Sequence, residues 1–405
     1  MYIYKVLANV VYINMPSRRF CNTGILSMRN TVMCIILFKI VLIASIMNFM
    51  FQNKMPTRVL YHNVTNYTIS IYSKLNNIEV KQSISLSLVA NGTTGGIRKY
   101  SSEYFPLCPP EEHLVGILKI DLDLAEKSYF EMNNMTSKDM KTHGNAFLGN
   151  FEERTLGNIS DFVLVFEPAH CLPPHSVAFI IPFRYREIHL RLLLGHLIPI
   201  LQRQFLRYSI FVINQSGNGT FNKGRLMNTG FEIASMVGKV NGKPFDCFIF
   251  HDVDLLAEYD TLLYRCPGGS AAIHMATTID KFDYHPMCCG ITVGGVLGMT
   301  EEQFRNVNGY SNEYWGWGGE DDDINGRIRN KKYWLSRPDA THGRYTMLAH
   351  EKDRGNADNG NRHATLKGAH ERWDTDGLKN LNTNVKSIHI YPQFTKIYVD
   401  VGKPS

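Results

Sequence analysis

Three short apolar segments separated by two helical patterns constrain the fold of this chain most. Residues 175–184, 208–216 and 245–254 are rich in β-branched and aromatic side chains, which is typical of buried strands. Residues 186–207 and 222–238 lie between them and carry apolar side chains at helical spacing. This alternating order predicts an α/β domain with a mostly parallel central sheet that is covered on both faces.

The site of ligand binding follows from this topology, because ligands gather at the carboxyl ends of parallel strands. The first predicted strand ends in Pro182, Phe183 and Arg184. Arg184 could pair with a phosphate and Phe183 could stack on a base, although the same residues could form an ordinary loop. The sequence contains no GxGxxG motif and no P-loop Lys-Ser/Thr pair, so a dinucleotide or ATP cradle of those kinds is not expected.

A candidate metal site follows the third predicted strand. Asp252 and Asp254 lie two residues apart, so on an extended strand both carboxylates face one side and can serve a divalent metal, although such a pair can also simply mark a strand end. Farther along, Met347 and His350 would share a side if that stretch turns helically. Carboxylate, imidazole and thioether together suit Mn²⁺ better than Mg²⁺ or Ca²⁺. The alternative is that these residues are a packed methionine and a surface histidine, which is the more frequent case for isolated residues of these types.

The segment WGWGGEDDD, residues 315–323, places two tryptophans among glycines and then four carboxylates in a row. The acidic residues could be only the solvated start of a helix. They could also supply a base, since the helix dipole favours an ionised carboxylate at that position. The net charge of +6 includes no block of Lys and Arg interleaved with aromatic residues, so a nucleic-acid groove is not indicated.

An apolar segment, residues 31–51, has about the ~20 residues that a helix needs to cross a bilayer. Arg18, Arg19 and Arg29 precede it, which predicts a cytosolic N-terminus and a luminal body. Lys39 costs roughly 3 kcal/mol in a span and leaves a buried helix as the alternative. N-x-S/T triplets concentrated before residue 160 agree with a luminal, glycosylated stem.

Four motifs in register resemble the β1,4-galactosyltransferase family of Golgi enzymes, including its invertebrate β1,4-N-acetylgalactosaminyltransferase branch. They are FVINQSGNGTFNKGRLMNTGF, FIFHDVDLL, NGYSNEYWGWGGEDDDINGRI and M-x-x-H, and the resemblance covers roughly residues 108–405. It implies a single-pass type II Golgi membrane protein with a cytosolic tail (1–30), a transmembrane signal anchor (31–51), a stem (52–103) and a luminal catalytic domain of GT-A type (104–405). The implied reaction is Mn²⁺-dependent, inverting transfer from a UDP-sugar, in β1,4 linkage, to terminal N-acetylglucosamine of glycoproteins or glycolipids.

The resemblance also implies roles for individual residues. Asp321 matches the catalytic base, Glu320 and Asp322 its acceptor-orienting neighbours, and Trp317 the mobile tryptophan that closes over the sugars. Indole rings fit the flat faces of sugars, and carboxylates fit their hydroxyl rims. The metal ligands correspond to Asp254, Met347 and His350, the donor contacts to Pro182, Phe183, Arg184, Arg186, Phe221, Lys223, Asp252 and Val253, and the acceptor pocket to Arg362, His363 and Leu366. The family disulfides correspond to Cys108 with Cys171 and Cys247 with Cys266.

Several positions depart from the family pattern. Lys223 replaces a more familiar arginine, and His363 stands where phenylalanine is frequent. Thr292 occupies a donor-pocket position where galactose-specific relatives carry a bulky tyrosine, so UDP-N-acetylgalactosamine is as strong a donor candidate as UDP-galactose. Residues 351–368 are expected to form a lid that orders over donor and metal, or else an ordinary surface loop. The alternative function is a sugar-binding surface protein of the same fold without turnover; a Ca²⁺-binding adhesion module is disfavoured because the D-x-D-x-D-G spacing is absent.

Overall fold

The computed structural model describes residues 67–75, 78–86, 106–109, 114–154, 164–169, 171–240, 242–285, 292–350 and 355–404. The predicted tail and membrane anchor, residues 1–51, lie outside these ranges. Within the described ranges, no helix has the length and apolar character that a membrane crossing requires. The chain divides into two compact units, of which one comprises Met1–Ser73 with Gln82–Ser102 and the other Lys74–Lys81 with Glu103–Ser405.

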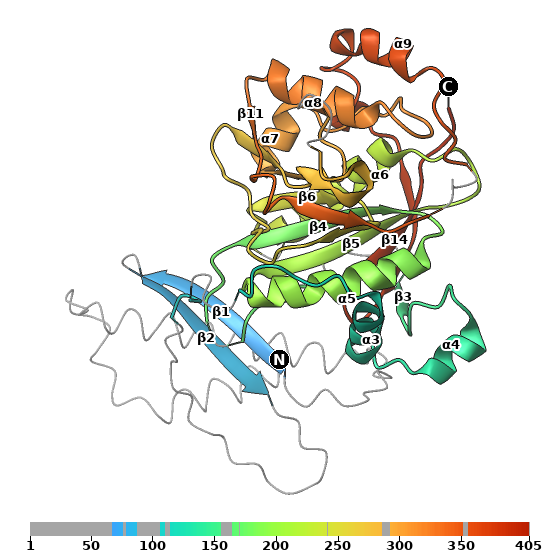
Figure 1. The fold of residues 1–405 in the computed structure, drawn as a ribbon. Helices are drawn as coiled ribbons and strands as arrows, with labels where there is room; N and C mark the ends of the chain where they lie inside the picture. The colour runs from blue at the N-terminus through green and yellow to red at the C-terminus, as the bar shows by residue number, and fades with distance from the viewer. Residues whose placement is uncertain are drawn as a thin grey trace, which may run out of the picture. The chain divides into compact units, whose positions relative to one another are not determined.

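A two-stranded sheet lies in the segment predicted as a stem. It consists of β1 (Tyr67–Leu75) and β2 (Ile78–Leu86), drawn in blue in Figure 1. No strand was predicted within this segment. Both segments nevertheless alternate apolar and polar residues, which is the period of a strand.

The larger unit is built on a nine-stranded sheet with the order β11-β8-β10-β6-β4-β5-β14-β13-β3. The strands are β3 (Glu152–Arg154), β4 (Ser176–Phe183), β5 (Arg207–Gln215), β6 (Cys247–His251), β8 (Ala271–His274), β10 (Val296–Met299), β11 (Trp334–Ser336), β13 (Asn384–Ile390) and β14 (Thr395–Asp400).

The sheet is mixed rather than mostly parallel. The central strands β6, β4, β5 and β14 are parallel, as the alternating pattern predicted. The strands added outside them include antiparallel pairs, in which β10 joins β6 and β8, and β13 joins β14 and β3. The short connection between β13 and β14 returns the chain directly, and a direct return allows antiparallel pairing without a crossover helix.

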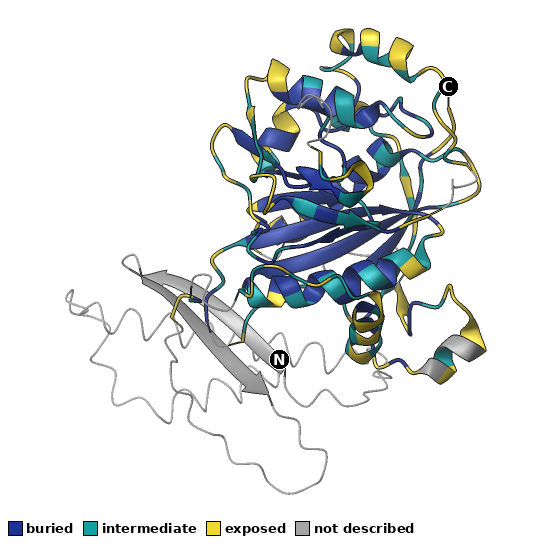
Figure 2. Cartoon of the chain, in the orientation of Figure 1, coloured by how far each residue is buried: buried dark blue, intermediate teal, exposed yellow. Residues whose placement is uncertain are grey.

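Helices cover both faces of the sheet, as predicted. They are α3 (Leu122–Met132), α4 (Ser137–His143), α5 (Glu187–Arg203), α6 (Lys223–Val240), α7 (Glu301–Asn306), α8 (Glu320–Asn330) and α9 (Arg362–Lys367). In Figure 1, α5 lies below the sheet, and α6, α7 and α8 lie above it. All eight residues of β4 are buried, and they divide between two cores: Phe179 and Ile181 pack in the core that includes α5, whereas Ile180 packs in the core that includes α6. Figure 2 shows the central strands of the large sheet as a buried layer.

A second, three-stranded sheet connects the segment after β6 to the chain beyond α8. It has the order β7-β12-β9, with β7 (Leu255–Ala257), β12 (Arg344–Met347) and β9 (Thr278–Ile279). Met347 therefore ends a strand, and the helical turn considered for this stretch is wrong. Met347 lies opposite Leu255 in the pairing of β12 with β7, which brings it next to the D-x-D motif.

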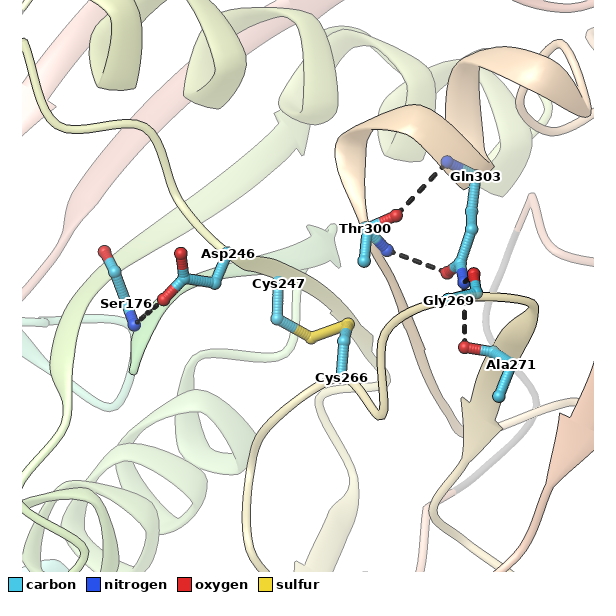
Figure 3. Close-up of a disulfide and its surroundings, with 8 residues drawn as sticks. All are labelled: Ser176, Asp246, Cys247, Cys266, Gly269, Ala271, Thr300 and Gln303. Carbon is cyan, nitrogen blue, oxygen red and sulfur yellow. Dashed lines mark hydrogen bonds between the residues drawn. A yellow bond between two sulfur atoms is a disulfide. The ribbon is translucent and has the colours of Figure 1, made fainter. Parts of the chain in front are cut away.

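Both disulfides implied by the resemblance are confirmed. Cys108 bonds to Cys171 and Cys247 bonds to Cys266. Figure 3 shows the second bond at the start of β6, where the Asp246 carboxylate also accepts a hydrogen bond from the backbone N–H of Ser176 at 2.8 Å. The hydrogen bond joins the beginning of β4 to the residue before β6, and the disulfide joins the beginning of β6 to Cys266, which precedes β8. Both contacts hold the end of β6 that is opposite the predicted site.

Candidate active site

Most of the predicted site residues surround one cavity of about 180 Å³, at the carboxyl ends of β4, β5 and β6. Its lining consists of Pro182, Arg184, Arg186, Phe221, Lys223, Asp252, Val253, Asp254, Gly316, Trp317, Glu320, Asp321, His350 and Asn356. Gly316 and Asn356 are the lining residues that the sequence analysis did not single out. Asn356 lies in an Asn- and Gly-rich stretch whose sequence offers no signal to distinguish one amide from another.

Some predicted residues lie away from this cavity. Phe183 is only 1% exposed, and its ring faces the Lys396 ammonium, whose Nζ lies 4.5 Å from the ring centroid. Its side chain is therefore part of the core beneath the cavity. Phe221 is the aromatic residue that reaches the lining, where the Arg184 guanidinium lies 5.0 Å from its ring centroid.

Asp254 and His350 form the candidate metal pair. His350 Nε2 lies 3.0 Å from Asp254 Oδ2, and the backbone N–H of Leu348 donates to the Asp254 carbonyl at 2.8 Å. Burial alone would raise the pKa of Asp254, but the hydrogen bond from His350 and its charge outweigh burial and hold that pKa below its ordinary value. An ionised carboxylate beside an imidazole is a donor pair that Mn²⁺ accepts.

Met347 is half-buried and packs against the core that includes α5. The described residues contain no cluster of three or more His, Cys, Asp and Glu side chains arranged to hold a metal. Coordination at this site therefore needs the thioether of Met347 or oxygen atoms of a bound ligand in addition to the Asp254 and His350 pair. The donor chemistry fits Mn²⁺ on that condition.

One ammonium group among the lining residues is surrounded by three carboxylates. Lys223 Nζ lies 3.0 Å from Asp252, 3.4 Å from Asp321 and 3.6 Å from Glu320. Burial raises the pKa of Glu320 to about 7, and the neighbouring Asp321 adds to the effect. Burial likewise raises the pKa of Asp252 to about 6, against the opposing effect of Lys223. Three carboxylates thus surround one ammonium group in this part of the lining, and a bound divalent metal would offset their remaining negative charge.

The acidic run at the start of α8 divides between the cavity and the core. Glu320 and Asp321 line the cavity. Asp323 is 1% exposed and accepts hydrogen bonds from Trp373 at 2.6 Å and from Arg327. The predicted helix start is confirmed, and it places all four acidic residues in the first turn, where the helix dipole favours negative charge.

The turn before α8 requires glycine. Gly319, the residue that caps the helix, has a φ of 102°, and Gly316 and Gly318 also have positive φ. A Cβ atom on Gly319 would lie 2.5 Å from the ring of Tyr314. Glycine is therefore needed both for the left-handed backbone and for the close approach of the aromatic ring.

Backbone hydrogen bonds join the tryptophan loop to two other loops of the site. The N–H of Trp317 donates to the carbonyl of Ala357 at 3.0 Å, and the N–H of Gly316 donates to the carbonyl of Phe221 at 2.7 Å. Phe221 in turn donates to the carbonyl of Gly355 at 2.8 Å. Trp317 is 57% exposed and lines the cavity.

The predicted acceptor residues lie on α9, within the segment expected to be a lid. Arg362 places its guanidinium 5.3 Å from the ring centroid of Trp317. His363 is exposed and Leu366 is half-buried, and neither lines the cavity. Burial and the charge of Asp321 raise the pKa of Asp322, while Arg362 and His363 of α9 act to lower it.

Comparison with known proteins places this geometry in a family. Residues 148–267 match the model of the N-terminal region of glycosyl transferase group 7, and residues 273–351 match the model of the N-terminal domain of galactosyltransferase. Human β-1,4-galactosyltransferase 2 is 44% identical over 239 residues, which are 59% of this chain and 62% of that protein. Mouse β-1,4-galactosyltransferase 1 is 38% identical over 300 residues, which are 74% of this chain and 68% of that protein.

Solved structures of a Drosophila relative also match. The catalytic domain of Drosophila β1,4-galactosyltransferase 7, in complex with xylobiose, is 30% identical, with a TM-score of 0.48, and the match covers 56% of this chain and 94% of that one. A mutant of that Drosophila protein was solved with manganese, UDP-Gal and xylobiose, with the same score and coverage. This chain spans less than two thirds of human β-1,4-galactosyltransferase 2, at 62% of its length, but 68% of the mouse protein. The two family models match consecutive segments that contain most of the site residues, and the mouse relative is matched over more than two thirds of its length. The chain therefore belongs to the β1,4-galactosyltransferase family.

Proposed function

We propose that this chain is an inverting, Mn²⁺-dependent hexosyltransferase that transfers galactose or N-acetylgalactosamine from the UDP-sugar, in β1,4 linkage, to terminal N-acetylglucosamine. The observation that carries this proposal is the convergence of two groups on one cavity: the Asp254 and His350 pair, and the carboxylates around Lys223. The names of the relatives, β-1,4-galactosyltransferases, supply the class of reaction.

The donor nucleotide fits the wall formed by Arg184, Arg186 and Phe221. Two guanidinium groups in one lining suit a diphosphate, because planar cations make paired hydrogen bonds to phosphate oxygens. The ring of Phe221 offers a flat apolar surface for the uracil base. Arg184 Nη1 donates to the carbonyl of Gly219 at 2.5 Å, which fixes the guanidinium next to this ring.

The metal would be held by Asp254, His350 and Met347. When bound there, Mn²⁺ supplies positive charge that stabilises the departing diphosphate. The contribution of the chain is to bring a carboxylate from the end of β6 to an imidazole that follows β12, with their polar atoms 3.0 Å apart. Lys223 holds the neighbouring carboxylate of Asp252 in place at 3.0 Å.

Asp321 is the base in this proposal. The acceptor 4-hydroxyl attacks the anomeric carbon from the face opposite the diphosphate; the new C–O bond forms as the bond to UDP breaks, and the hydroxyl proton passes to a carboxylate oxygen of Asp321. Asp321 lies at the start of α8, and its carboxylate is 3.4 Å from Lys223 Nζ. Glu320 presents a buried Oε2 that accepts no hydrogen bond within the described residues, and an acceptor hydroxyl would satisfy it.

The donor sugar is the open choice within this proposal. A threonine at position 292, in place of a bulky tyrosine, leaves room for an N-acetyl group and supports UDP-N-acetylgalactosamine beside UDP-galactose. We also propose that residues 31–51 anchor the chain in the Golgi membrane as a single-pass type II protein, with residues 104–405 in the lumen. Protease protection and glycosidase digestion of the full chain in sealed Golgi vesicles would test this topology.

The transferase activity is tested with the purified luminal chain, Mn²⁺, a GlcNAc-terminated acceptor, and either UDP-galactose or UDP-N-acetylgalactosamine. We expect transfer from at least one donor, loss of transfer with EDTA, and recovery with added Mn²⁺. Asp374→Asn, a change at an exposed carboxylate paired with Lys331, serves as the matched control and should transfer at the parental rate. Binding of the acceptor glycan without transfer from either donor would instead favour a sugar-binding protein of the same fold.

A further inference from the structure

We propose that His274 and Arg337 are positioning residues that hold the donor-pocket segment, residues 292–295, against Asp321, and that they thereby set both the rate of transfer and the choice of donor sugar. This inference rests on the transferase function proposed above and assigns its donor selectivity to two residues outside the cavity lining. The contacts that carry it form one continuous chain from β11 to the base.

Two carbonyl groups of the donor-pocket segment are held by this pair of side chains. Arg337 Nη2 donates to the carbonyl of Thr292 at 3.0 Å, and Arg337 Nε donates to His274 Nδ1 at 3.1 Å. Since Nδ1 accepts a hydrogen bond, the proton of the neutral ring is on Nε2. His274 Nε2 therefore donates to the carbonyl of Gly294, at 2.8 Å.

The fold brings these residues together through strand pairing. His274 is the last residue of β8, and Arg337 directly follows β11, which pairs in parallel with β8 so that Ser336 lies opposite Ile273. His274 is completely buried. Burial lowers the pKa of His274 to about 4, and the charge of Arg337 acts in the same direction, so the ring stays neutral and keeps this hydrogen-bond pattern across physiological pH.

The braced segment touches the proposed base. A Cβ atom added to Gly294 would lie 2.7 Å from Asp321 Oδ2, so there is no room for a side chain between residue 294 and this carboxylate. The N–H of Gly294 also donates to Thr292 Oγ1 at 3.3 Å, which turns the threonine side chain back onto its own segment. A shift of this segment would therefore move the surroundings of Asp321 and of Thr292 together.

This arrangement explains how a distant pair of side chains can affect the reaction. A displacement of the base by about 1 Å can cost on the order of a hundredfold in rate. A pocket also discriminates between sugars by size only when its wall resists displacement, because a mobile wall makes room for either donor. The two hydrogen bonds to the carbonyls of Thr292 and Gly294 supply that resistance.

The test compares Arg337→Ala, His274→Leu and His274→Gln with the parent. We measure kcat and KM with UDP-galactose and UDP-N-acetylgalactosamine, the affinity for UDP, and amide hydrogen exchange in residues 292–299. For Arg337→Ala and His274→Leu we expect kcat to fall about tenfold or more. The ratio of kcat/KM for the two donors should move severalfold closer to one, and the affinity for UDP should stay within about threefold of the parent. His274→Gln retains a donor and an acceptor and should recover most of what His274→Leu loses.

The matched control is Arg305→Ala, which removes an arginine that hydrogen-bonds to Glu232, Ser235 and Glu301 away from the cavity. A folded Arg337→Ala protein with parental kcat, donor preference and exchange would overturn the proposal. If Arg337→Ala does not fold, Arg337→Lys takes its place, since lysine keeps the charge but cannot make both hydrogen bonds. If the parent transfers neither sugar, the proposed function fails, and the positioning role is then decided by exchange in residues 292–299 alone.

Discussion

The carboxyl groups of Asp321 and Asp323, two residues apart in the first turn of α8, lie in different environments. Asp321 lines the cavity and lies 3.4 Å from Lys223 Nζ. Asp323 points into the core and binds Trp373 Nε1 at 2.6 Å. Positions two residues apart on a helix face different directions, so one acidic run lines the cavity with one residue and makes a structural contact with another.

Asparagine at each of these positions should separate the two roles. Asp321→Asn removes the proton acceptor while keeping the shape of the side chain, so we expect kcat to fall by at least about a hundredfold with UDP affinity nearly unchanged. Asp323→Asn weakens a buried contact to Arg327 and should lower the free energy of unfolding by about 2 kcal/mol. Steady-state kinetics and urea unfolding of both variants check this, and near-parental turnover in Asp321→Asn would remove that residue from its role.

The stability of the metal-free protein should depend on Glu320. Because its pKa is raised to about 7, mainly by burial, the folded state retains a proton that the unfolded state loses at lower pH. Its contribution is therefore fully present below about pH 4.5 and is lost as the pH rises through about 7. In thermal melts with EDTA, the melting temperature of Glu320→Gln should therefore rise relative to that of the parent as the pH is raised from 5 to 8. An equal difference at both pH values would mean that Glu320 is ionised throughout.

Local patterns in the sequence predicted the central part of the fold. The strand and helix patterns at 175–254 correspond to β4, α5, β5, α6 and β6, and the acidic run does start a helix. The D-x-D motif was expected at the end of a buried strand, and it follows β6 directly. These features depend on period and on residues adjacent in sequence, which are visible without coordinates.

Features that depend on distant contacts could not be predicted in the same way. All eight residues of β4 are buried and nearly all are apolar, so the sequence has no alternation of apolar and polar residues to show that Phe183 faces the α5 core rather than the cavity. Met347 lies on a strand because β7 and β9 pair with it from far away in the chain. Likewise, no local signal placed Lys223 among three carboxylates or linked Arg337 to Thr292.

Substitution of a proposed metal ligand should weaken Mn²⁺ binding and leave the fold intact. His350→Asn and Asp254→Asn each take one donor from a pair that lies at the edge of the cavity, so we expect Mn²⁺ affinity to fall by at least about tenfold. Titration of free Mn²⁺ by electron paramagnetic resonance measures this directly. His370→Asn makes the same substitution at an exposed histidine that does not line the cavity, and it is the matched control. Unaltered affinity in both ligand variants would place the metal elsewhere.

The preference between the two donor sugars should depend on the volume of the side chain at position 292. Thr292→Tyr fills the space proposed for an N-acetyl group, so kcat/KM for UDP-galactose relative to UDP-N-acetylgalactosamine should rise by roughly tenfold or more. Thr292→Val has a similar volume to threonine and should leave this ratio close to that of the parent. Competition assays with both donors in one reaction give the ratio directly, and the same ratio in Thr292→Tyr would show that position 292 does not face the sugar.

The contact between Gly294 and Asp321 makes a separate prediction about the base. Gly294→Ala would place a methyl group 2.7 Å from Asp321 Oδ2, and the carboxylate can relieve that contact only by rotating or moving by a few tenths of an ångström. Because the contact is with the end of a side chain rather than with backbone, we expect a small change in melting temperature and a fall in kcat of about tenfold. The affinity for UDP should stay parental, since the atoms nearest the added methyl group belong to Asp321 and Thr292 and not to Arg184 or Phe221. Parental kcat in Gly294→Ala would show that the position of Asp321 does not limit the rate.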